Sequence, residues 1–139
     1  MNISVVDASV ALKWELAEIH SENAARVLTS GAMLVAPDLI YVEIGNALWQ
    51  HVRRGNLSLV DAGEALQELL RAPVVTFPSK ALLPLAFDFA AVTGRSVYDS
   101  LYLAAAGALQ AQVVTADARL NNALAGGPWA HLVLWIWDV

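Results

Sequence analysis

Short apolar runs alternate along this chain with longer stretches in which apolar residues recur at helical spacing. Four runs are rich in valine and other apolar residues without strict apolar–polar alternation, which is typical of strands buried on both faces. We expect these strands at residues 3–6, 33–36, 74–77 and 113–117, and a further strand, at an edge, over 131–137.

The stretches between these runs predict helices, because their apolar positions repeat every three or four residues and turn signals bound them. The expected helices cover residues 8–16, 21–30, 38–54, 58–72, 79–92 and 97–109, with a short one ending at 124. This alternation predicts an α/β fold, a three-layer α/β/α sandwich with a mostly parallel central sheet. The length of 139 residues fits one domain, residues 1–139, with one core.

Carboxylates stand where two of the expected strands end. Asp7 follows Val5-Val6, and Asp117 follows a run that begins with Val113-Val114. In parallel α/β sheets the ligand crevice lies beyond the carboxyl ends of the strands, so both acids are candidate site residues. Taken singly, each could instead cap the helix that follows it.

Two more acids lie on predicted helices. Asp99 comes three residues after Ser96, which also satisfies a capping box. Glu43 falls inside an apolar stripe, where an unpartnered carboxylate is costly to bury. A cation would supply the missing partner. We therefore expect Asp7, Glu43, Asp99 and Asp117 to converge at one edge of the sheet, where mutual repulsion requires a divalent ion. All-oxygen ligation suits Mg²⁺ or Mn²⁺, and no histidine or cysteine is placed for a zinc site.

Composition narrows the choice of function. The chain is 58% hydrophobic and only 15% charged, which excludes disorder and suggests that a second copy or another protein covers some apolar surface. The net charge of −5 argues against a protein that holds nucleic acid by phosphate contacts alone, though not against an enzyme whose acids bind cations. The sequence has no cysteine, no signal-type segment and no membrane-length apolar run, so we expect a cytoplasmic protein.

Four segments together resemble the PIN-domain ribonucleases, specifically the VapC toxins of bacterial toxin–antitoxin pairs. They are residues 5–9 (VVDAS), 37–48 (PDLIYVEIGNAL), 97–104 (VYDSLYLA) and 114–120 (VTADARL). Each motif alone is weak, but all four occur in order and at family-like spacing over essentially the whole chain. The resemblance implies a PIN-like fold and a metal-dependent endoribonuclease that hydrolyses RNA phosphodiester bonds.

The resemblance also implies roles for individual residues. Asp7 and Asp99 would be the firmest metal ligands, and Glu43 and Asp117 would complete the four-carboxylate site for Mg²⁺, which Mn²⁺ can replace. Ser9, Asn46 and Thr115 would support these ligands. The partners it implies are an RNA substrate, a cognate antitoxin protein and a second copy in a homodimer. Among the basic residues, Arg95 is the best placed to contact a substrate phosphate, because it precedes the helix that carries Asp99.

Two other functions stay open at this stage. A phospho-acceptor receiver domain also gathers acids and Mg²⁺ at strand ends, but it needs an acidic pair at the first strand and a lysine after a late strand. Neither Lys13 nor Lys80 is in that position, and Asp7 has no acidic neighbour. A catalytically idle interaction module would account for the excess of apolar residues, including Trp49, Trp129, Trp135 and Trp137.

Overall fold

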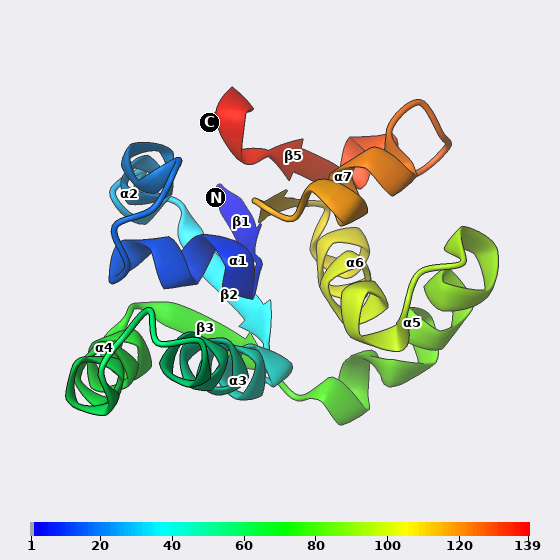
Figure 1. Ribbon diagram of the computed structural model, residues 1–139. Helices are drawn as coiled ribbons and strands as arrows, with labels where there is room; N and C mark the ends of the chain where they lie inside the picture. The colour runs from blue at the N-terminus through cyan, green and yellow to red at the C-terminus, as the bar shows by residue number, and fades with distance from the viewer. Residues whose placement is uncertain (1) are drawn as a thin grey trace.

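A single parallel sheet organises the computed structural model, which describes residues 2–139 (Figure 1). Its strand order is β3-β2-β1-β4-β5, and all four pairings are parallel, including that of the last edge strand. The strands are β1 (Ile3–Val6), β2 (Met33–Pro37), β3 (Val74–Phe77), β4 (Gln112–Thr115) and β5 (Val133–Trp135). The predicted α/β fold with a parallel sheet is confirmed.

Helices cover both faces of this sheet. Figure 1 shows α1 to α4 on one side of the sheet and α5 with α6 on the other. Their bounds are α1 (Ala8–Ala11), α2 (Ser21–Leu28), α3 (Leu39–Arg53), α4 (Leu59–Arg71), α5 (Ser79–Thr93), α6 (Val97–Leu109) and α7 (Ala118–Leu124). Helix α6 packs directly on β1, β2 and β4, and its residues 100–106 are all buried. The small side chains of Ala104, Ala105 and Ala106 allow this close approach.

Two expected elements are shorter in the structure than the sequence pattern predicts. The first helix ends at Ala11 and continues as a 3₁₀ turn over Leu12–Trp14, where the indole Nε1 of Trp14 donates a hydrogen bond to the carbonyl of Ala24 at 2.8 Å. Strand β5 covers three residues rather than seven, between 3₁₀ turns at each end. It pairs only with Val113 to Thr115, because β4 ends there.

Serine caps fix where two helices begin. The Oγ atoms of Ser58 and Ser96 accept hydrogen bonds from the backbone N–H groups of Asp61 and Asp99, each at 3.0 Å. The cap at Ser96 was expected from its spacing to Asp99. The cap at Ser96 sets the first turn of α6 and thereby the position of Asp99.

Within residues 2–139, none of the helices has both the length and the apolar character needed to cross a bilayer.

Gly94 provides a test of how α5 ends before the chain turns toward Asp99. Its φ of 71° lies in the left-handed region, which an alanine adopts only with strain. We expect Gly94→Ala to lower the free energy of unfolding by about 1 kcal/mol. Gly63→Ala, inside α4 where an added Cβ meets nothing within 4 Å, should raise it by about 0.5–1 kcal/mol. Chemical denaturation measures both, and effects of the same sign would contradict this account.

Candidate active site

Asp7 lies at the carboxyl end of β1, and two hydroxyl groups hold its carboxylate. The Oγ1 of Thr115 donates to Asp7 Oδ2 at 2.7 Å, and the Oγ of Ser9 donates to the same oxygen at 3.1 Å. The hydroxyls also accept from the backbone: Ser9 from Ala116 and Thr115 from Asp117, each at 3.0 Å. This network ties the ends of β1 and β4 together and positions the loop that carries Asp117.

Glu43 projects from α3 toward α6, where it meets Tyr102. The phenol of Tyr102 is 2% exposed and donates to Glu43 Oε1 at 2.6 Å. Burial raises the pKa of Glu43 to about 7, and the charges of Asp7, Asp99 and Asp117 act in the same direction. Burial likewise raises the pKa of Tyr102, so this phenol stays protonated and remains a donor.

Tyr102 is the site residue that the sequence analysis missed. It stands three residues after Asp99 on α6, a spacing that places the two side chains about one turn apart on the same side of the helix. A phenol among the leucines and alanines of a buried helix needs a hydrogen-bond partner. That requirement, together with the spacing from Asp99, could have identified Tyr102 from the sequence.

Asp99 lies in the first turn of α6 and Asp117 is the N-cap of α7, and donors hold both carboxylates. Asp99 Oδ2 accepts from Arg95, at 3.0 Å from Nη2 and 3.3 Å from Nε, and both side chains are about one quarter exposed. Arg95, the expected phosphate contact, is thus paired with a candidate metal ligand. Asp117 Oδ1 accepts the backbone N–H of Arg119 at 2.9 Å and so caps α7.

The four acids lie close enough to influence each other. The pKa of Asp7 is raised, and burial of its carboxyl group is the largest cause. The hydrogen bonds from Thr115 and Ser9 lower this pKa, whereas the charges of Asp117 and Asp99 raise it further. No three acidic, histidine or cysteine side chains within residues 2–139 come close enough, as they stand, to hold a metal ion together.

Each of the four carboxylates is engaged through one oxygen. The hydrogen bonds described above go to Asp7 Oδ2, Glu43 Oε1, Asp99 Oδ2 and Asp117 Oδ1. The second oxygen of each acid accepts no hydrogen bond from any described residue. Each acid therefore keeps one oxygen of the kind that a hard divalent cation binds, although no three of these side chains within residues 2–139 are close enough, as they stand, to share one. The positive charge of such an ion would also offset their mutual repulsion.

Asn46 does not take the supporting position expected for it. Its side chain is exposed and forms no hydrogen bond within the described chain. It lines a groove along α3 that begins at Glu43. Asn46 therefore neighbours Glu43 without orienting its carboxylate.

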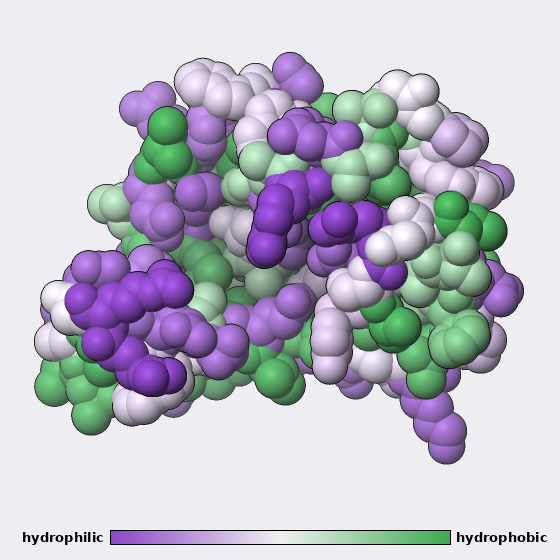
Figure 2. Space-filling view, turned by 45° about the vertical axis from the view of Figure 1, so that its right-hand side comes forward, coloured by the Kyte–Doolittle hydropathy of each residue, from purple (hydrophilic) through white to green (hydrophobic). Residues whose placement is uncertain are grey.

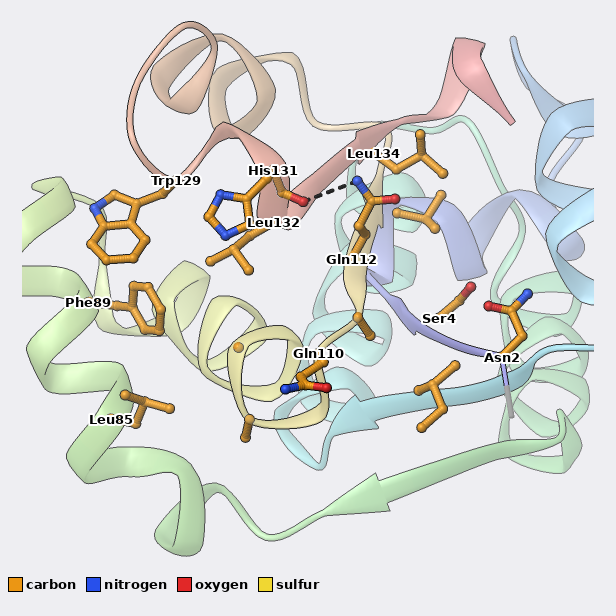
Figure 3. A pocket seen from close by; sticks show the side chains of 15 residues that line it. Asn2, Ser4, Leu85, Phe89, Gln110, Gln112, Trp129, His131, Leu132 and Leu134 are labelled. Carbon is orange, nitrogen blue, oxygen red and sulfur yellow. Dashed lines mark hydrogen bonds between the residues drawn. The ribbon is translucent and has the colours of Figure 1, made fainter.

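A larger hollow lies away from these acids. This cavity of about 960 Å³ is lined by the first residues of β1 and β4 and by side chains of α5 and the C-terminal segment (Figure 3). Asn2, Gln112 and Trp129 face it, and Gln112 donates to the carbonyl of His131 at 3.1 Å. None of the four acids lines it. The cavity is at the opposite end of the strands, so the candidate active site is the shallower edge where the acids gather.

Comparison with known proteins identifies the family of this chain. A sequence profile of the PIN domain matches residues 4–124. Ribonuclease VapC9 of Mycobacterium tuberculosis is 36% identical over 118 residues, which cover 85% of this chain and 88% of that protein.

Solved structures share the fold. PAE2754 from Pyrobaculum aerophilum superposes with a TM-score of 0.67 and 22% identity, over 98% of this chain and 85% of that one. A chain of a toxin–antitoxin complex from Klebsiella pneumoniae superposes with a TM-score of 0.65 and 11% identity. The superposition covers 98% of this chain and 99% of that one. The fold, the match over residues 4–124 and the identity to VapC9 lead to one conclusion: this chain belongs to the PIN-domain family, and within it to the VapC ribonucleases.

Proposed function

We propose that this chain hydrolyses RNA phosphodiester bonds with Mg²⁺ held by Asp7, Glu43, Asp99 and Asp117. PIN-domain VapC nucleases are metal-dependent. The observation that carries the proposal for this chain is that each acid has one oxygen fixed by a donor and one left free. Oxygen ligands without histidine or cysteine favour Mg²⁺, with Mn²⁺ as the natural substitute.

Hydrolysis joins a water oxygen to phosphorus and breaks the bond from phosphorus to the 3′ oxygen, which leaves a 5′-phosphate and a 3′-hydroxyl. When bound, Mg²⁺ would lower the pKa of the attacking water and offset charge on the leaving oxygen. The chain's own residues prepare the site: Ser9 and Thr115 fix the orientation of Asp7, and Tyr102 fixes that of Glu43.

Arg95 has two roles in this proposal. Without metal its guanidinium neutralises Asp99 at 3.0 Å. From this position beside Asp99 the guanidinium would also suit a phosphate oxygen of the substrate, because arginine donors match the geometry of phosphate.

We further propose that the chain is the cytoplasmic toxin of a toxin–antitoxin pair and forms a homodimer. Large apolar side chains stand exposed on two helices, including Val42 and Trp49 on α3 and Phe87 and Val92 on α5. Exposed apolar surface of this kind is typical of protein interfaces. Two separate faces are consistent with an antitoxin and a second copy as partners.

The assignment of the acids is tested by Asp7→Asn. The asparagine oxygen can still accept from Thr115 and Ser9, so the fold should remain while the charge is lost. We expect RNA cleavage to stop, and thermal melting by circular dichroism to change little. Asp88→Asn, which removes an exposed acid from α5, is the matched control and should cleave normally. Full cleavage by the Asp7 variant would refute the assignment.

Metal removal tests the cofactor. We expect excess chelator to stop cleavage of a labelled RNA by the wild-type protein, and added Mg²⁺ or Mn²⁺ to restore it. Isothermal titration calorimetry should detect Mn²⁺ uptake by the wild type and much weaker uptake by Asp7→Asn. Cleavage that persists in chelator would contradict a metal mechanism.

The raised pKa of Glu43 predicts a pH dependence of the metal-free protein. A folded-state pKa of about 7, above the ordinary 4.5, means that the folded protein holds this proton more tightly than the unfolded chain. The free energy of unfolding should therefore fall as pH rises from about 5 to about 7, by an amount on the order of 1 kcal/mol because solvent screens this partly exposed group.

Glu43→Gln keeps an oxygen for Tyr102 and cannot titrate. In the presence of chelator, denaturation at several pH values should show that the free energy of unfolding of this variant depends less on pH than that of the wild type. The dependence that remains comes from Asp7. Profiles of equal steepness for variant and wild type would show that Glu43 is not the titrating group.

A further inference from the structure

A polar groove leads away from the candidate active site along α3. It has a volume of about 350 Å³ and is lined by Glu43, Asn46, Ala47, Gln50, His51 and Arg54. These residues recur every three or four positions, which places them on one side of the helix. From Glu43 to Arg54 the helix rises about 16 Å, so the groove extends well beyond a single phosphodiester.

The groove offers hydrogen-bond donors that the protein does not use. The side chains of Asn46, Gln50, His51 and Arg54 make no hydrogen bond or ion pair within residues 2–139. The acids at its start, by contrast, are all engaged. Unused donors in line with a nuclease site are suited to the sugars, bases and phosphates of a bound strand.

Two arginines without an ion pair within residues 2–139 stand at the far end of this groove. Of its eight lysines and arginines, Lys13, Arg71, Arg95 and Arg119 are paired with carboxylates. Among the four that form no ion pair within the described chain, Arg53 and Arg54 are adjacent. Figure 2 shows hydrophilic side chains on the side of the molecule where α3 and α4 lie; the colour marks acidic and basic residues alike. Two adjacent arginines without an ion pair give a net negative protein a local point of attraction for a polyanion.

We propose that the groove along α3 binds the single-stranded RNA that flanks the scissile bond, with Arg54 on a backbone phosphate and Asn46, Gln50 and His51 on sugar or base edges. This proposal rests on the proposed function, because it takes the acids beside Glu43 as the cleavage site. The strand leaves that site along α3 and passes Gln50 before it reaches Arg54.

Arg53 is a built-in control for this proposal. Arginines at a helix C-terminus also stabilise the helix dipole, an explanation that applies equally to Arg53 and Arg54. Only Arg54 lines the groove; Arg53 lies about 100° around the helix, on the side that carries the exposed Trp49. Glutamine at either position removes the same charge.

The test measures binding of a labelled oligouridine of about ten nucleotides by fluorescence anisotropy. Every protein carries Asp7→Asn so that no RNA is cut. We expect Arg54→Gln to weaken binding about fivefold to tenfold and to reduce the slope of log affinity against log salt by about 0.7. Arg53→Gln should weaken binding less than about twofold. With Asp7 restored, Arg54→Gln should raise KM for RNA and leave kcat close to wild type.

Equal losses for Arg53→Gln and Arg54→Gln would overturn the proposal, because they would indicate only general electrostatic attraction. Unchanged RNA binding by Arg54→Gln would overturn it too, and a loss of antitoxin association in that variant would assign the groove to the protein partner. Failure of the proposed function has a different signature: the wild type itself would not cleave RNA in Mg²⁺. Oligouridine binding remains measurable in that case, so the two failures are distinguishable.

Discussion

The structure depends on how four carboxylates are kept together at one end of a parallel sheet. Burial and mutual repulsion raise the pKa of Asp7 and Glu43, and both effects oppose the charged forms. Donors from Ser9, Thr115 and Tyr102 partly compensate, since a hydrogen bond to a carboxylate favours its ionised state. The remaining negative charge at this edge of the molecule favours a cation, which is the basis of the proposed metal site.

Residues that pack in the core of the fold also orient the acids of the candidate site. Thr115 is a fully buried residue at the end of β4, and its hydroxyl contacts both Asp7 and the backbone of Asp117. Tyr102 belongs to the buried run of α6 that covers the sheet, and its phenol reaches across to α3. Packing of the core sets the positions of these donors, and the donors set the orientation of the acids.

Much of this could be predicted from the sequence, for identifiable reasons. The strand ending at Val6 and the helix beginning after Ser96 follow from local apolar runs and caps, which depend only on neighbouring residues. The contact from Tyr102 to Glu43 joins residues 59 positions apart, so no local pattern reveals it. The pairing of Arg95 with Asp99 depends on side-chain rotation, which residue spacing leaves open.

A net charge of −5 is unfavourable for binding RNA, but the distribution of charge matters more than its sum. Electrostatic attraction at physiological salt acts over about 8 Å, so a strand responds to the nearest charges rather than to the sum over the chain. Four of the basic residues are neutralised by carboxylates, whereas Arg53 and Arg54 remain together at the end of α3. A metal site beside Glu43 and a phosphate contact at Arg54, as proposed, are thus compatible with the net negative charge of this chain.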